Sequence, residues 1–467
     1  MQVQAAKKDE ERRDFILRGS MWKVLISISL PLVLYNGINH LFAFLDTVIA
    51  SNISSQVVST VSFVSQIHLM FTAVGSGLSI GGGILIARYF GAGDMVNVKK
   101  HISTVLFLAL IISGILLLVF IPLAVPFLRL LRIPEELVAD GAWYFTIQLS
   151  SLVCIFINTI FFSTEKSKGN TKIILYLNIM VLSIKLLLTL FFVYVLKTGM
   201  LMLAVASLIA HTSVTIIAVI RLTRKSNPFS FSVKAVDLSP KVIKPILFLS
   251  LPVFTEKFAF SFGKVIVNSM SAAYGSIAVG ALGVSNKISA LSTSPPDGVQ
   301  EAETSIISQN LGNNNVPRAI AFFKKTLTFN LIFGIALFIL MTVFKDAVIG
   351  LFARGDPVFA AEIEKIYRYE RYAAVFLAVN TSVMGFLYGF GLTQVAMVIN
   401  IARLFLFRIP PLWIIQRYTA LDSSGVGLAM FISNALTGIT AITVCFFVIR
   451  KMKKQQAASA EFVMGQV

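Results

Sequence analysis

The apolar segment 34–51, LYNGINHLFAFLDTVIAS, contains one carboxylic acid, Asp46. A charged side chain at the centre of a membrane helix costs about 2.5–3.5 kcal/mol on insertion scales, and such residues are commonly functional. Tyr35, Asn39 and Asp46 are spaced by four and then seven residues, which places them on one face of a helix. We expect Asp46 and Asn39 to bind a coupling proton or sodium ion and Tyr35 to contact a substrate.

The apolar segment 173–196 carries a second polar stripe. Asn178, Lys185 and Thr189 are spaced by seven and then four residues, so they share a helical face and are further candidates for ion coupling. Because Asp46 and Lys185 are the ionisable residues deep in the first half of the chain, we expect them to face each other. A cation at Asp46 would compete with the Lys185 ammonium and let the helices repack, which would make the pair an ion-controlled switch. The alternatives are a permanent salt bridge and no contact.

The second half of the chain carries acids and bases within or near its apolar segments. In PPDGVQEAETSI (295–306), Asp297 and Glu301 share one helical face and Glu303 lies on another. We expect a set of charged and aromatic residues to contact substrate: Tyr35, Glu256, Asp297, Glu301, Glu303, Arg403 and Arg408. By helix number, the charged residues expected nearest to the acids of 295–306 are Glu256, Lys264, Arg403 and Arg408, of which the last three are basic. A cavity with both signs would fit a cationic, zwitterionic or polar-headed compound; the alternative is that the arginines neutralise the acids structurally.

Nothing in the residue pattern indicates an enzyme, a metal site or an organic cofactor. Cys154 and Cys445 fall within apolar segments, and the histidines lack metal-ligand spacing. The segment GSGLSIGGG (75–83) is rich in glycine but lacks a following GK[ST], so close helix packing explains it better than phosphate binding. The expected coupling ion is H+ or Na+. A proton is favoured, because a lone aspartate with a lysine competitor suits protonation.

The composition indicates a membrane protein. Of the 467 residues, 56% are hydrophobic and only 13% are charged, about half the charged fraction of a soluble protein. Twelve apolar runs are long enough to approach or exceed the roughly 20 residues of a membrane helix. They lie near 22–50, 57–87, 102–127, 142–164, 173–196, 199–220, 246–272, 277–309, 326–350, 372–390, 393–416 and 425–449. The predicted fold class is therefore an all-α integral membrane protein with twelve transmembrane helices.

The net charge of +18 reports orientation rather than nucleic-acid binding. Basic residues gather in the N-terminal segment, after the even-numbered spans (Lys166, Lys168 and Lys172 follow the fourth), and in the central linker. Fewer lie on the other side, among them Lys365, Arg368 and Arg371. By the positive-inside rule, we expect both termini to be cytoplasmic, the protein to be multi-pass in the cell membrane, and its basic residues to meet membrane lipid.

The two halves of the chain repeat one unit. A constant offset of 221 residues aligns the Ser-Leu-Pro at 29–31 with that at 250–252 and Gly91 with Gly312. We therefore expect an N-terminal segment 1–21, a first lobe 22–220, a linker 221–241, a second lobe 242–450 and a tail 451–467. Two parallel six-helix repeats meeting at a pseudo-two-fold axis are a transporter plan. The alternatives are a membrane scaffold or a receptor of duplicated origin.

Several of these stretches also resemble a known family. LPLVLYNGINHLFAFLDTVIA followed by GLSIGGGILIARYFGAGD, their counterparts beginning LPVFTEKF in the second half, and RLFLFRIPPLW (403–413) are similar to motifs of the multidrug and toxic compound extrusion (MATE) family. That family belongs to the multidrug/oligosaccharidyl-lipid/polysaccharide flippase superfamily. The resemblance implies a V-shaped pair of six-helix bundles and export driven by inward flow of Na+ or H+. It also implies that Asp46 matches the family's first-helix acid, whereas Lys185 and Thr189 stand where relatives often carry Asn and Asp.

The predicted function is thus secondary active export of small organic, cationic or amphipathic compounds by alternating access of a monomer. The runner-up is a flippase for lipid-linked oligosaccharides or lipid precursors. A flippase cavity should be strongly basic to hold a pyrophosphate, and the acids at 297–303 count against that.

Overall fold

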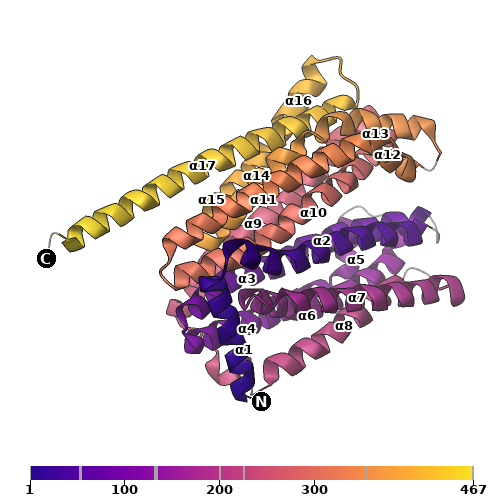
Figure 1. Cartoon of the computed structure of the whole chain (residues 1–467). Helices are drawn as coiled ribbons and strands as arrows, with labels where there is room; N and C mark the ends of the chain where they lie inside the picture. Colours follow the sequence, from indigo (N-terminus) through magenta and orange to yellow (C-terminus); the bar gives the residue numbers. More distant parts are fainter. Residues whose placement is uncertain are drawn as a thin grey trace.

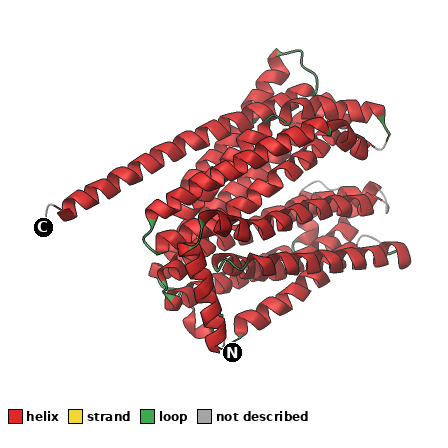
Figure 2. Cartoon of the chain, in the orientation of Figure 1, coloured by secondary structure: helices red, strands yellow, loops and turns green. Residues whose placement is uncertain are grey.

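The computed structural model describes residues 2–51, 55–130, 135–198, 201–224, 227–353 and 355–464. Within these ranges it describes all side chains except those of 2–6, 43–51, 55–63, 66, 130, 136–137, 140 and 455–464. Over the described ranges the chain is helical with short connections and contains no strand, as Figure 2 shows. The predicted all-α fold is confirmed.

The first lobe contains six long helices, because each apolar run is long enough to satisfy its backbone hydrogen bonds internally across a bilayer. These are α2 (Met21–Ser51), α3 (Ser55–Ala92), α4 (Met95–Phe120), α6 (Glu135–Ser167), α7 (Thr171–Leu190) with a π-helical turn η1 (Phe191–Val195), and α8 (Leu201–Thr223). Two shorter helices accompany them: α1 (Gln2–Arg18) and α5 (Ala124–Leu130).

The second lobe repeats this plan. Its long elements are α9 (Pro240–Ser271), α10 (Ser276–Gly312), α11 (Val316–Val343), α13 (Pro357–Glu370) with α14 (Ala373–Phe390), α15 (Thr393–Phe405) with α16 (Ile409–Tyr418), and α17 (Ser424–Met464). Three short elements complete it: η2 (Val233–Ala235), η3 (Ala272–Tyr274) and α12 (Lys345–Ala353).

Eleven helical segments in the described ranges are long and apolar enough to cross a membrane. The one predicted span that is not among these eleven is the eighth along the chain, α10. It has 37 residues and packs against α2, α3, α11 and α14. It is less apolar than the others because it carries Lys287, Asp297, Glu301 and Glu303. The polar composition of α10 is explained by its central position, where it is covered by protein rather than lipid.

Two local features of the second lobe bear on the predicted spans. The region before 372, expected to lie outside the tenth span, forms the amphipathic helix α13, which packs on α10 and α17. The eleventh span is broken between α15 and α16, immediately before Pro410 and Pro411, because proline disfavours a helical conformation in the residue before it and cannot donate a backbone hydrogen bond.

The two lobes approach each other at one end and diverge towards the other. Figure 1 shows α2–α8 on one side and α9–α17 on the other, close together where α3 and the C-terminal end of α1 lie. The most extensive inter-lobe contacts are formed by α2 with α10 and by α3 with α9 and α10. We call the end that contains α1 and the turns after α3 and α10 the closed end.

Glycines related by the repeat form the contact nearest the closed end. A Cβ atom at Gly91 of α3 would overlap the backbone carbonyl of Gln309, and one at Gly312 of α10 would overlap that of Arg88. Residues 88 and 309 are themselves related by the offset of 221 that relates the two glycines. The contact is therefore pseudo-symmetric, and it requires a residue without a side chain at both positions.

A second pair of contacts obeys the same symmetry deeper between the lobes. A Cβ at Gly77 would lie 2.8 Å from Ser250 O and 2.9 Å from Phe254 Cβ, and one at Gly298 would lie 2.5 Å from Val33 N. Phe254 and Val33 are again 221 residues apart. The glycine-rich segment 75–83 thus serves close helix packing, as predicted.

The N-terminal segment is a helix that touches both lobes. Arg12 of α1 donates to Asn170 Oδ1 in the first lobe at 2.9 Å. Arg318 of the second lobe donates through Nη2 to the backbone oxygens of Gly19 at 2.5 Å and Ile16 at 3.2 Å. The helix α1 therefore ties the lobes together at the closed end.

Candidate functional site

An ion pair joins the two lobes beside a polar pocket. Lys166 Nζ of α6 lies 2.8 Å from Glu301 Oε2 of α10, and Asn36 Nδ2 of α2 donates to Glu301 Oε1 at 3.4 Å. The pocket next to the pair has about 450 Å³ of empty space, part of which is open to solvent, and is also lined by Ser163, Thr304 and other residues of α3, α6, α10 and α14. Glu301 therefore lies at the centre of the inter-lobe contact.

The prediction for the counter-charge of Glu301 is wrong. It placed the partner among the bases of the second lobe and assigned Lys166 to a cytoplasmic flank. The helix α6 extends to Ser167, so that Lys166 is still helical and points across to α10. Tyr35 lies near this pair, as shown by the effect of the Glu301 charge on the Tyr35 phenol. The phenol also forms a hydrogen bond with the side chain of Asn39.

We expect the Lys166–Glu301 pair to contribute about 1 kcal/mol, since both side chains are partly solvated, 22% and 31% exposed. A double-mutant cycle of Lys166→Met and Glu301→Gln, read by thermal unfolding of the purified protein, should give a coupling energy of about that size. Lys172→Met, an exposed lysine on the neighbouring helix α7, is the control and should show no coupling to Glu301→Gln. Additive effects of the two substitutions at the pair would contradict the prediction.

The ion-coupling candidates of the first lobe lie on helices that pack together. Asp46 lies on α2, but its side chain is outside the described residues, so the pairing of Asp46 with Lys185 stays a prediction. The helices α2 and α7 are in contact, as that pairing requires. Lys185 is half-buried, and its charge acts on the imidazoles of His68 and His211.

Two of the ion-coupling candidates on α7 carry buried polar groups that lack hydrogen-bond partners among the described atoms. These groups are Nδ2 of Asn178, a residue that is 6% exposed, and Oγ1 of Thr189, a residue that is 2% exposed. A buried polar group without a hydrogen bond is costly, which commonly marks a place for water, an ion or a ligand. Both groups were predicted to take part in ion coupling, and their unsatisfied state is compatible with that prediction.

Glu256 of α9 is held by neutral donors. The Tyr388 hydroxyl donates to its two oxygens at 2.9 and 2.7 Å, and Asn400 Nδ2 donates at 2.8 Å. Tyr388 also lines the inter-lobe pocket, so Glu256 adjoins that pocket through the phenol. Tyr388 and Asn400 were missed by the sequence analysis, because uncharged residues in apolar helices carry no distinctive spacing.

Glu303 is fully buried inside the second lobe rather than in contact with the inter-lobe pocket. Its carboxyl group lies against Gly385 of α14, and neither oxygen has a hydrogen-bond partner among the described residues. Asp297, in contrast, is half-buried on the same face as Glu301, and the charges of Lys257 and Arg403 act on it. The substrate-contact prediction for Glu303 is therefore not supported, whereas that for Asp297 and Glu301 is compatible with their positions.

The arginines at the break in the eleventh span have neutral hydrogen-bond partners. In the described part of the chain, neither Arg403 nor Arg408 forms a salt bridge; both donate to Asn434, and Arg408 also donates to Ser433. Neutralisation of the acids through direct salt bridges is therefore not supported, although the charge of Arg403 acts on Asp297 from a greater distance.

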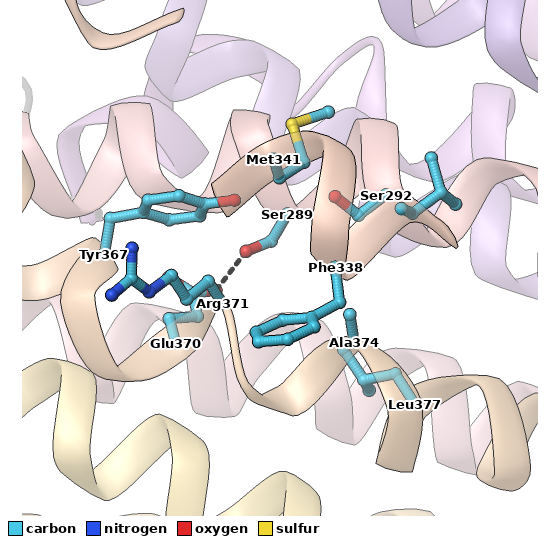
Figure 3. A pocket seen from close by; sticks show the side chains of 10 residues that line it. Ser289, Ser292, Phe338, Met341, Tyr367, Glu370, Arg371, Ala374 and Leu377 are labelled. Atoms are coloured by element: carbon cyan, nitrogen blue, oxygen red, sulfur yellow. Dashed lines mark hydrogen bonds between the residues drawn. The ribbon is translucent and has the colours of Figure 1, made fainter. Parts of the chain in front are cut away.

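Glu370, at the end of α13, is a buried acid that the sequence analysis missed. Its carboxylate accepts hydrogen bonds from Ser285 and, at 2.6 Å, from Ser289 of α10. Figure 3 shows Glu370 beside Ser289 in a second, smaller pocket, which is lined by residues of α10, α11, α13 and α14 and is partly open to solvent. The sequence feature that could have revealed Glu370 is the helical spacing of residues 363, 366, 367 and 370, which share one face of α13 and are all buried.

Two pseudo-symmetric lobes of long apolar helices, with charged groups at their interface, have the architecture of a membrane transporter. The family profile MatE matches residues 31–191 and 252–414, which covers both lobes. The chain therefore belongs to the multidrug and toxic compound extrusion (MATE) family.

Similar proteins extend over nearly the whole chain. A probable multidrug resistance protein NorM from Thermotoga maritima is 23% identical over 454 residues, which are 94% of this chain and 95% of that protein. A crystal structure of a MATE protein in complex with MaL6 has a TM-score of 0.91 at 20% identity, over 94% of this chain and 99% of that one. A multidrug resistance MATE transporter in an outward-facing conformation has a TM-score of 0.89 at 20% identity, over 94% and 98%. These likenesses confirm the predicted fold.

Proposed function

We propose that this chain exports small organic compounds, cationic or amphipathic, in exchange for H+ or Na+, with Asp46 as the residue that binds the coupling cation. Two observations support export of such compounds. The chain belongs to the MATE family, and its relatives are named as multidrug resistance proteins. The observation that carries the proposal is the pseudo-symmetric contact of the two lobes at one end, because such a contact can be exchanged for a contact at the other end.

The positive-inside rule supports a cytoplasmic position for the closed end. This end contains α1, with its lysines and arginines, and the basic turn after α6. The protein would then be in an outward-facing state in the cell membrane, with both termini in the cytoplasm, and would act as a monomer. In this state Asp46 would take up a cation from outside.

Alternating access would couple that cation to the substrate. Binding of a proton or Na+ at Asp46 would release Lys185, and the equilibrium between outward- and inward-facing states would shift by the difference in cation affinity between them. Opening the closed end would require separation of Lys166 from Glu301 and of the two glycine contacts. The residues around the inter-lobe pocket would thereby become accessible from the cytoplasm.

Gradient-driven flux through the purified protein in liposomes tests the proposal. Rhodamine 123 should cross the membrane in the direction opposite to the flow of H+ or Na+ down an imposed gradient. The ion whose gradient drives this movement is the coupling ion. Absence of flux with either gradient, together with translocation of a lipid-linked oligosaccharide, would overturn the proposal in favour of the flippase, which the family relatives do not favour.

A further inference from the structure

Two arginines of the second lobe converge on one neutral oxygen. Arg403 Nε donates to Asn434 Oδ1 at 2.9 Å, and Arg408 Nη2 donates to the same oxygen at 3.0 Å. Arg408 Nε also donates to Ser433 Oγ at 3.3 Å, and Ser433 Oγ donates to the backbone oxygen of Arg403 at 2.8 Å. Neutral partners thus hold two guanidinium groups close together, although their charges repel each other.

A lysine of α9 adds a third positive charge. Lys264 Nζ lies 4.9 Å from the centroid of the Phe260 ring, and Arg403 Cζ lies 5.2 Å from the same centroid. Lys264 is solvent-exposed, and its charge acts on His40 of α2, so it faces the first lobe. We call Lys264, Arg403 and Arg408 the basic cluster; it extends from the interior of the second lobe to the space between the lobes.

The basic cluster lacks a matching anion among the described residues. No carboxylate of the described side chains lies within 4.0 Å of any of its nitrogens. Three acids act on it from a greater distance. Glu370 is bound by two serines and Glu256 by Tyr388 and Asn400, while Asp297 also has Lys257 near it. Cations at membrane depth are normally paired, so the cluster is arranged for an anion that comes from elsewhere.

We propose that the basic cluster binds an anionic group, a carboxylate, sulfonate or phosphate, of an organic substrate. A planar guanidinium matches such oxyanions with paired hydrogen bonds, and the lysine ammonium adds a mobile point charge at the side where the substrate enters. The aromatic ring of Phe260 supplies an apolar surface beside the oxyanion. The proposal rests on the proposed export function and narrows its substrates to amphipathic compounds that carry a negative charge, zwitterions included.

Two xanthene dyes of opposite charge provide the test, because they share a ring system. Fluorescence anisotropy with the purified full chain should show that fluorescein, an anion, binds, and that Lys264→Gln and Arg403→Gln each weaken its affinity by roughly tenfold or more. The affinity for the cationic rhodamine 123 should stay within about twofold or increase. Lys244→Gln, an exposed lysine on the same helix α9, is the matched control and should change neither.

Three outcomes would overturn the proposal: no binding of fluorescein, an unchanged affinity in both variants, or an equal loss of both dyes, which would indicate a structural role. Should Arg403→Gln fail to fold, Lys264→Gln still decides, because Lys264 is exposed and its side chain forms no hydrogen bond with the described residues, so that its replacement should leave the fold intact. Lys264→Glu should reverse the preference and favour rhodamine 123.

Competition experiments distinguish a lipid phosphate from a soluble organic anion as the ligand. Flux experiments distinguish failure of the anion site from failure of the proposed export function. Displacement of fluorescein by short-chain phosphatidic acid would identify a lipid phosphate as the ligand, and its failure to displace would identify a soluble organic anion; either result keeps the site. Gradient-driven flux of rhodamine 123 without binding of fluorescein would overturn the anion site and leave the export function intact. Binding of fluorescein without gradient-driven flux of either dye would support the site and overturn the export function.

Discussion

Asp46→Asn is expected to abolish gradient-driven transport while the protein remains folded. Asparagine has nearly the same shape as aspartate, but it cannot carry the charge that takes up H+ or Na+. Without that charge, the cation gradient has no differential affinity through which to shift the lobes, so the coupled flux should fall to the background of empty liposomes. Flux of rhodamine 123 in liposomes is the measurement. Glu10→Gln, which removes an exposed acid from α1, should transport like the unmodified chain.

The double variant Asp46→Asn with Lys185→Met decides between a switch and a static salt bridge. Removal of one partner of a buried pair destabilises by about 3–5 kcal/mol, because the other charge stays behind, whereas removal of both relieves that penalty. A static pair predicts that the double variant regains both thermal stability and transport. A switch predicts that it regains stability alone. Full transport in Asp46→Asn would contradict any role of this residue in coupling.

Gly312→Val is expected to open the closed end. A side chain at this position would overlap the carbonyl of Arg88, and a backbone atom cannot move aside as the end of a flexible side chain can. Overpacking of this kind costs about 1–3 kcal/mol, which corresponds to a roughly fivefold to 150-fold loss of the outward-facing population. Gly91→Val should have the same effect, because the repeat places it against Gln309 in the equivalent contact.

Distances between spin labels on the two lobes would measure that opening. Labels on Val96 of α4 and Lys324 of α11, both exposed, should lie farther apart in Gly312→Val and in Gly91→Val, and transport should fall in both. Gly114→Val is the matched control, since a Cβ at Gly114 of α4 would meet nothing within 4 Å. An unchanged distance distribution in both glycine variants would contradict the role assigned to this contact.

The hydrophobic pattern of the sequence determined the class of fold. Apolar runs of about 20 residues have one stable form in a bilayer, the helix, so the number of spans follows from run length alone. The offset of 221 residues predicted two equivalent lobes, and it also relates the paired contacts of Gly91 and Gly312. Even the polar character of α10 was visible, although its reason, a central position between both lobes, was not.

Only the tertiary structure decided which charged groups meet. Spacing along a helix places residues on a common face, but it does not tell which other helix that face contacts. Lys166 therefore looked like a flanking residue, whereas the length and direction of α6 bring it to Glu301 in the other lobe. Likewise, the break between α15 and α16 brings Arg403 and Arg408 to Asn434 instead of to the acids of α10. The reason is that side-chain partners depend on helix rotation and crossing, which are set by packing against the whole fold rather than by local sequence.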